Sequence, residues 1–152
     1  MKNGNIGKVV NITDNQEEIM KAEYLRFRAF GIPFGVTDCD TFSFYYHQIT
    51  NKNMIPYALY IRGRMVAGCY VSSTYDSLFI DQLFVMPELQ GSGLKLGRLL
   101  LSYVLANKDE IGEFFNKDFE RSSLETLNAK TTAIYQKVGY ERHGHLMTKK
   151  LK

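Results

Sequence analysis

A glycine-rich turn, Gly91-Ser92-Gly93, holds the residues best suited to chemistry, because it joins two apolar segments of different character. Residues 78–85 are predicted to form a strand, and the residues from the turn to about Ala106 a helix. This order places the unpaired backbone N–H groups of a helix N-terminus at the end of a sheet, where they and the helix dipole attract phosphate. The turn therefore predicts a site for a phosphorylated ligand.

Two common phosphate-binding motifs do not fit this turn. A dinucleotide-binding fingerprint has the spacing G-x-G-x-x-G, whereas Gly91, Gly93 and Gly97 follow G-x-G-x-x-x-G, and no second βαβ unit comes after them. A P-loop ends in Gly-Lys-Ser/Thr, which the turn lacks. The ligand is therefore expected to be neither a nicotinamide dinucleotide nor a nucleoside triphosphate held in these ways.

The turn instead resembles the signature of the GNAT superfamily of CoA-dependent N-acetyltransferases. That signature reads Val-x-Pro-x-(aromatic or Leu)-(Arg or Gln)-x-x-Gly-x-(Gly or Ala) and leads into a helix. The matching residues are Val85, Pro87, Leu89, Gln90 and Gly93. Lys95 departs from the pattern, because it stands where the family usually has a small residue.

A second segment resembles the same family. Its members often have Asn, then Tyr seven residues later, then Lys-x-Gly-(Phe or Tyr). The corresponding residues here are Asn128, Tyr135, Lys137, Gly139 and Tyr140. Two motifs in this order are more specific than either alone, and the resemblance covers roughly residues 6–150, although it is weak before Tyr57.

The resemblance implies acetyl-CoA as the co-substrate. The backbone of the turn would hold the pyrophosphate. The strand before the turn would separate from its neighbour, and the pantetheine arm would pair with the open edge. A backbone N–H near Phe84 or Val85 would polarise the thioester carbonyl. The implied cofactor-binding residues are Leu83, Phe84, Val85, Gln90, Gly91, Ser92, Gly93, Leu94, Lys95, Asn128 and Tyr135. No metal is implied.

Two residues are candidates for proton transfer. The resemblance places Tyr135 near the CoA sulfur as a general acid; the alternative is a tyrosine that only packs on the sheet. Asp81 is the candidate base or anchor of a basic water. Its strand parity predicts that it shares the face of Leu83 and Val85. Its alternatives are an ion pair with a basic residue or recognition of a cationic substrate.

The expected fold is a single domain over residues 1–152, a mixed α/β (α+β) protein of three layers. A mixed, mostly antiparallel sheet of six to seven strands is flanked by about four helices. The expected strands are 6–13, 57–61, 65–73, 78–85, 121–127 and 140–151. The expected helices are 16–30, 42–49, the one that ends near 106, and 128–139, while 108–119 is a loop or a short helix.

Composition narrows the partners and the compartment. The net charge is +3 with no cluster of basic residues, which argues against nucleic acid. Cys39 and Cys69 lie far apart, which favours a reducing compartment over a disulfide framework or a zinc site. Residues 1–15 are polar, so we expect no signal peptide, no membrane span and a cytoplasmic location.

Three functions remain open from the sequence. The first is an N-acetyltransferase that moves acetyl from acetyl-CoA to the primary amine of a small molecule or peptide, by direct attack in a ternary complex. The second is a catalytically weak acyl-CoA-binding sensor or interaction module. The third is an unrelated α/β fold whose glycine turn is structural. Because family members are often dimers, a homodimer is among the expected states.

Overall fold

A seven-stranded sheet forms the centre of the computed structural model, which describes residues 7–31, 44–91, 95–125 and 129–152. The strands are β1 (Lys8–Asn11), β2 (Ile55–Ile61), β3 (Arg64–Thr74), β4 (Ser77–Val85), β5 (Arg121–Glu125), β6 (Glu141–His143) and β7 (Leu146–Lys150). Their spatial order is β1-β2-β3-β4-β5-β7-β6. Every neighbouring pair is antiparallel except β4 and β5. The expected mixed, mostly antiparallel sheet is confirmed.

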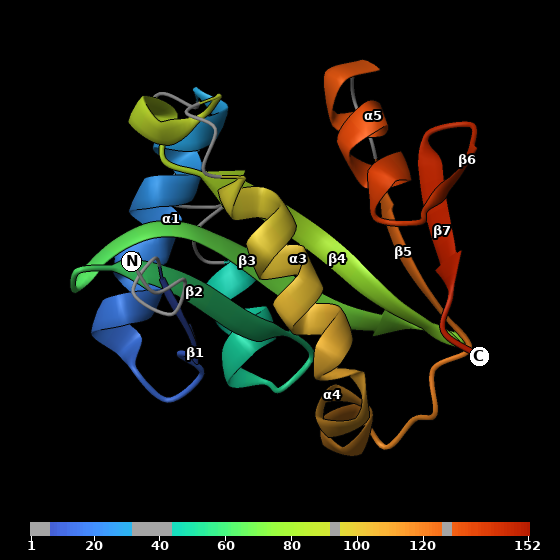
Figure 1. Ribbon diagram of the computed structural model, residues 1–152. Helices are drawn as coiled ribbons and strands as arrows, with labels where there is room; N and C mark the ends of the chain where they lie inside the picture. Colours follow the sequence, from blue (N-terminus) through green and yellow to red (C-terminus); the bar gives the residue numbers. More distant parts are fainter. Residues whose placement is uncertain (1–6, 32–43, 92–94, 126–128) are drawn as a thin grey trace.

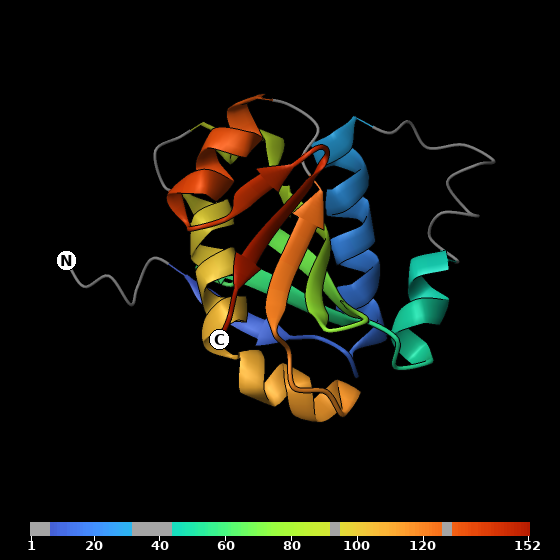
Figure 2. The same ribbon diagram turned by 90° about the vertical axis from the view of Figure 1, so that its right-hand side faces the viewer.

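Helices cover both faces of this sheet, which gives the three expected layers (Figures 1 and 2). On one face lie α1 (Gln16–Phe30) and the helical segment 44–50. On the other lie α3 (Leu96–Ala106) and α5 (Ala129–Lys137), and α4 (Lys108–Phe115) follows α3 directly. The short 3-10 helix η2 (Pro87–Leu89) connects β4 to the glycine turn.

Helix α1 has the bounds that its sequence predicts, because local signals define both ends. The side chain of Asn15 accepts a hydrogen bond from the Glu18 N–H at 3.2 Å, which caps the first turn. Gly31 ends the helix in the left-handed conformation, with φ of 66°. Between them, Ile19 and Ala22 recur at helical spacing and are buried against the sheet.

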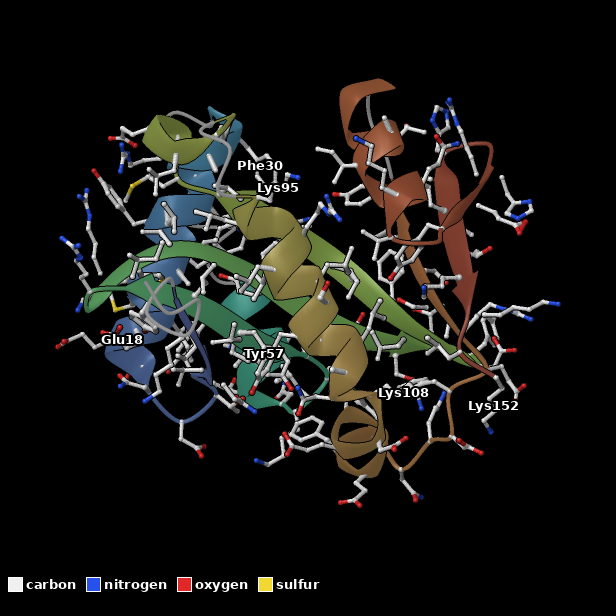
Figure 3. All side chains as sticks on the ribbon, in the orientation of Figure 1. Glu18, Phe30, Tyr57, Lys95, Lys108 and Lys152 are labelled. Carbon is white, nitrogen blue, oxygen red and sulfur yellow. The ribbon has the colours of Figure 1, made fainter. Side chains whose placement is uncertain are left out.

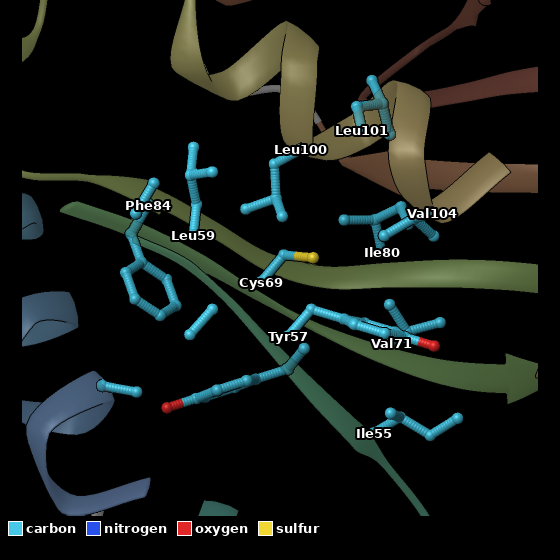
Figure 4. Close-up of a cluster of buried hydrophobic side chains, with 14 of the residues drawn as sticks. Ile55, Tyr57, Leu59, Cys69, Val71, Ile80, Phe84, Leu100, Leu101 and Val104 are labelled. Atoms are coloured by element: carbon cyan, nitrogen blue, oxygen red, sulfur yellow. The ribbon is translucent and has the colours of Figure 1, made fainter. Parts of the chain in front are cut away.

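Helix α3 is fixed by an apolar stripe that packs on the centre of the sheet. Leu100, Leu101 and Val104 are fully buried, and Figure 4 shows them above Cys69 of β3 and Ile80 of β4. Burial of each such side chain stabilises the fold by about 1.5–3 kcal/mol. The packing holds the N-terminus of α3 at a fixed place relative to the end of β4.

The C-terminal segment differs from the expected single strand over residues 140–151, which is wrong. The chain turns back after His143, with Gly144 in the left-handed conformation at φ of 67°. His143 therefore pairs with Leu146 in a tight hairpin, so β6 and β7 are two antiparallel strands. The segment 108–119, expected to be a loop or short helix, contains α4, which ends at Asn116 with φ of 56°.

Candidate active site

The strands β4 and β5 run together for only part of their length. Their parallel pairing extends from Ser77 with Arg121 to Ile80 with Leu124. Beyond Ile80, no described strand pairs with this edge of β4, and Figure 1 shows the two strands diverging toward the end where α3 begins. The predicted separation of the strand that carries the first motif is therefore present in the described part of the chain.

The open edge of β4 presents backbone hydrogen-bonding groups. Met86 donates its N–H to the Val66 carbonyl on the β3 side at 2.8 Å. Because alternate residues of a strand bond to opposite sides, the N–H and C=O groups of Leu83 and Val85 face the open edge. Gln90 already donates its side-chain amide to the Val85 carbonyl at 2.8 Å. The remaining groups suit a ligand with amide bonds in an extended chain.

The N-terminus of α3 supplies a second set of backbone donors beside this edge. The first backbone bond of the helix runs from the Leu99 N–H to the Lys95 carbonyl at 3.0 Å. The N–H groups of the three preceding residues, 96–98, come before that bond, and no side chain caps this end. These donors and the helix dipole suit a phosphate group.

Lys95 has an unusual backbone conformation at this helix start. Its φ of 54° and ψ of 45° lie in the left-handed region, which disfavours a residue with a side chain by about 1–2 kcal/mol. Glycine adopts this conformation without that cost, which explains physically why a small residue fits the motif here. The Lys95 side chain is exposed. A lysine in place of the small residue of the motif therefore leaves the backbone N–H donors of the helix start in place.

A cavity of about 620 Å³ joins the open edge, the start of α3 and the residue Tyr135. Figure 3 shows Phe30 and Lys95, which both line it, where α1 ends and α3 begins. We call it the first cavity. Its lining includes the predicted residues Leu83, Phe84, Val85, Gln90, Gly91, Lys95 and Tyr135. The structure thus brings residues of both sequence motifs together at one cavity.

Tyr135 lies on α5 and lines the first cavity. Its ring is 6.4 Å from that of Tyr140, whose hydroxyl is within 2.7 Å of the Ser122 hydroxyl in a buried hydrogen bond. Burial raises the pKa of Tyr135 above its ordinary value. The phenol therefore keeps its proton at neutral pH, which is the state that a general acid requires.

Asp81 does not share the face of Leu83 and Val85, so that expectation is wrong. Tyr70 of β3 pairs with Gln82, and the next residue of β3 pairs with Ile80, which leaves Asp81 as the extra residue of a β-bulge. A bulge interrupts the alternation of side chains along a strand. Asp81 consequently lines another cavity, beside the helical segment 44–50, rather than the first cavity.

The Asp81 carboxyl is half-buried, and its surroundings act on it in opposite directions. Burial raises the pKa of Asp81, a hydrogen bond from the Gln82 side chain lowers it, and the charge of Glu125 raises it again. The net effect is a raised pKa. A carboxyl of this kind takes up a proton more readily than an exposed one, so it suits either proton transfer or the binding of a cation.

Some of the predicted site residues cannot be placed, because the structure does not describe them. Cys39, Ser92, Gly93, Leu94 and Asn128 lie outside the described residues. Several residues that line the first cavity were not among the predicted cofactor-binding residues: Ala29, Phe30, Gly97, Leu101, Ile134 and Lys137. Ile134 and Lys137 could have been predicted because they are close to Tyr135 on α5, and Leu101 because it follows Gly97 at helical spacing. Nothing in the sequence linked the end of α1 to this cavity.

The described residues contain neither a metal-binding cluster nor a helix that could span a membrane. In residues 7–31, 44–91, 95–125 and 129–152, no group of three or more His, Cys, Asp or Glu side chains is arranged to hold a metal ion. Within the same residues, each helix is too short or too polar to cross a bilayer.

Solved structures with known folds resemble this one over nearly their whole length. The ribosomal-protein-S18-alanine N-acetyltransferase of Escherichia coli has a TM-score of 0.74 at 16% identity, with 97% of this chain and 95% of that chain covered. The PaiA N-acetyltransferase of Thermoplasma acidophilum, in complex with coenzyme A, has a TM-score of 0.64 at 15% identity, covering 95% and 98%. The aminoglycoside 6'-acetyltransferase type Ii has a TM-score of 0.72 at 14% identity, covering 95% and 97%.

The predicted fold is therefore confirmed: the chain has the fold of the GNAT acetyltransferases. No protein-family model and no curated protein matches the sequence. The likeness, at these identities, is one of fold, and the chemistry has to be argued from the site.

Proposed function

We propose that this protein is an N-acetyltransferase that transfers the acetyl group of acetyl-CoA to a primary amine. The observation that carries the proposal is the first cavity, where an unpaired strand edge, an uncapped helix N-terminus and Tyr135 meet. These are the three features needed to hold a pantetheine amide chain, a pyrophosphate and a leaving thiolate. A solved structure of the same fold contains coenzyme A, which supports the assignment.

Acetyl transfer would follow from this arrangement by direct attack. The amine nitrogen forms a bond to the thioester carbon, and the backbone N–H of Val85, which faces the open edge, stabilises the oxyanion. The C–S bond then breaks, and Tyr135 donates its proton to the thiolate. The amine loses a proton to Asp81, directly or through water, and Tyr135 regains its own from solvent.

The second candidate is an acyl-CoA-binding module with little or no turnover. It is favoured by Lys95, which replaces the small residue of the motif, and by the displacement of Asp81 from the face of Leu83. Both candidates require acetyl-CoA binding, but only the first requires release of free CoA when an amine is added.

The decisive test is calorimetric titration of acetyl-CoA into the protein and into a Gly97→Asp variant. A Cβ at Gly97 would be 3.9 Å from the nearest Val85 atom, which is ordinary contact. A carboxylate in the first turn also suits the helix dipole, so the variant should fold. It should repel the pyrophosphate and weaken binding at least tenfold.

Ser102→Asp is the matched control, because Ser102 is exposed on the same helix and does not line the first cavity. We expect it to bind acetyl-CoA as the native protein does. If the native protein and both variants bind acetyl-CoA with equal affinity, the pyrophosphate does not bind at the start of α3. Absence of binding to the native protein would reject both candidate functions.

A further inference from the structure

A second cavity, of about 390 Å³, lies where β3 and β4 meet the helical segment 44–50 and the end of α4. Asp81 and Lys117 are the charged residues among its described lining, and the hydroxyl-bearing residues Ser72 and Ser73 also line it. The aromatic residues Phe44 and Phe115 contribute apolar surface to the lining. The cavity thus presents one carboxylate, one ammonium group and apolar surface.

The two charges have no ionic partner among the described residues. The ammonium group of Lys117 donates a hydrogen bond to the Tyr75 carbonyl at 2.9 Å. This carbonyl is a neutral acceptor. Asp81 receives a hydrogen bond from the Gln82 side chain and forms no salt bridge with a described cation. The charge of buried Arg26 lowers the pKa of Asp81, but its guanidinium group is already paired with Glu23 at 2.8 Å. Each charge in the cavity is therefore available to a ligand.

The fold holds these two charges apart. Lys117 is bound to Tyr75 in the turn before β4, whereas Asp81 lies four residues after Ser77, the first residue of β4. With a strand rise of about 3.3 Å per residue, the backbones of Ser77 and Asp81 are about 13 Å apart, and Lys117 is bound before Ser77, at Tyr75. A ligand that meets both must carry its own opposite charges at separate points.

Asp81 lies on β4 at the point where the pairing with β5 ends and the open edge begins. It directly follows Ile80, the last residue of β4 that pairs with β5, and precedes the residues of the open edge. An amine held at Asp81 therefore lies beside the strand segment that faces the first cavity. A group held at Lys117 lies farther along the strand, away from that segment.

We infer that the acceptor is a zwitterionic amino acid, whose reacting amine lies at Asp81 and whose carboxylate lies at Lys117. The inference rests on the proposed acetyl transfer and names its substrate class. A polycationic acceptor would place positive charge near Lys117, and a monoamine without a carboxylate would leave Lys117 without an ionic partner. The methylene groups between the two ends of the acceptor would contact Phe44 and Phe115.

The first experiment measures acetylation of unbranched ω-amino acids of increasing chain length beside their primary amides and the diamines of equal length. An amide keeps the amine but removes the negative charge. We expect kcat/KM for the acid to exceed that for its amide and its diamine about tenfold or more at the best length. Equal values at every length would overturn the inference.

The second experiment assigns that preference to Lys117. Lys117→Gln should bring the acid-to-amide ratio close to one, and Lys117→Arg should retain it. Lys108→Gln is the matched control, because Lys108 begins α4 but does not line the second cavity. An unchanged ratio in Lys117→Gln would contradict the assignment, and thermal melting of each variant checks that it is folded.

Calorimetry separates failure of this inference from failure of the proposed function. If the protein does not bind acetyl-CoA, the proposed function fails. If it binds acetyl-CoA but treats acids, amides and diamines alike, only the acceptor class is wrong. When turnover is absent, titration of each acid and amide into the protein with CoA still tests the preference, because binding at the second cavity does not require the transfer step.

Discussion

The first and second cavities are constructed from different parts of the chain. The first presents backbone groups, namely the edge of β4 and the start of α3, among apolar side chains and the cationic residues Lys95, Arg98 and Lys137. The second presents side-chain charges from Asp81 and Lys117. Backbone geometry persists when most side chains change, whereas a charge is gained or lost by a single substitution. Under the proposed function, the cofactor site would therefore vary less between proteins of this fold than the acceptor site.

The matched structures agree with this contrast. Their names describe an acetyltransferase acting on the alanine of a ribosomal protein and another acting on an aminoglycoside, although both have the fold of this chain. A cofactor site made of backbone groups belongs to the fold, while the acceptor site has to be argued for each sequence from its own side chains.

The largest expected effect comes from removing the hydroxyl at the first cavity. Tyr135→Phe should lower kcat about 100-fold or more, because the thiolate then leaves without a proton donor, while acetyl-CoA binding changes little. Steady-state kinetics with calorimetry measures both quantities. Tyr103→Phe, on the exposed side of α3, is the control and should keep full activity. A normal kcat in Tyr135→Phe would leave this tyrosine with a packing role only.

The next effect concerns the buried network behind β4, on the face of α1. Glu23 accepts hydrogen bonds from Arg26 at 2.8 and 2.9 Å and from the Tyr70 hydroxyl, and all three residues are buried. Glu23→Ala leaves the guanidinium without its partner, so we expect a loss of about 3–5 kcal/mol in the free energy of unfolding.

Urea denaturation measures that loss. Glu17→Ala is the control, because it removes a carboxylate that is 83% exposed and lies 3.8 Å from Lys21, so it should change stability far less. A double variant, Glu23→Leu with Arg26→Met, should recover most of the loss. If Glu23→Ala behaves like Glu17→Ala, the network contributes little to the rigidity of this face.

A smaller effect is expected from the charge at the second cavity. Because burial raises the pKa of Asp81 in the folded protein, the fold favours its protonated form. This favourable contribution is complete below the ordinary pKa, about 4, and is lost as pH rises through the folded pKa. Asp81→Asn should therefore melt at a higher temperature than the native protein at pH 7, and the difference should vanish at low pH.

Melting temperatures across a pH series test this sign. Asp76→Asn serves as the comparison, because Asp76 is more exposed and pairs with Arg121 at 3.1 Å. We expect no stabilisation in that variant at any pH. A lower melting temperature for Asp81→Asn at pH 7 would mean that the carboxylate has a favourable partner in the folded protein.

The smallest effect is expected at Lys95. Replacement by glycine removes the left-handed strain of about 1–2 kcal/mol but adds about 0.4–1 kcal/mol of freedom to the unfolded chain. Lys95→Gly should thus be more stable by about 0.5 kcal/mol, as measured by chemical denaturation. Asn116→Gly, at a similar φ of 56°, should change stability less, because asparagine tolerates this conformation. A destabilised Lys95→Gly would reveal a stabilising contact of the lysine side chain.

Local signals in the sequence predicted much of the fold and of the first cavity. Helix α1 was predictable because Asn15 and Gly31 define its ends within a few residues of the chain. The first cavity was predictable in outline because its turn and its helix are adjacent in sequence. The opening of the β4 edge was expected only through the resemblance to the GNAT family.

The second cavity was not predictable, because it depends on tertiary pairing. The face of Asp81 is set by the register between β3 and β4, which contains a bulge that neither strand reveals alone. Likewise, Lys117 bonds to Tyr75, a residue 42 positions earlier in the chain. Charge positions of this kind follow from strand register and loop contacts rather than from any local motif.

The open edge of β4 has a consequence for the behaviour of the protein without ligand. Unpaired strand groups are a template on which another polypeptide strand can add, and a protein that leaves them free is prone to association. Among the described residues, η2, α3 and α5 contribute to the first cavity, which lies beside this edge. A slender amide chain fits such a recess more readily than a strand with side chains on both faces. Bound cofactor would thus occupy the place of a paired strand at this edge of β4. We expect the protein to resist self-association best when the cofactor is bound.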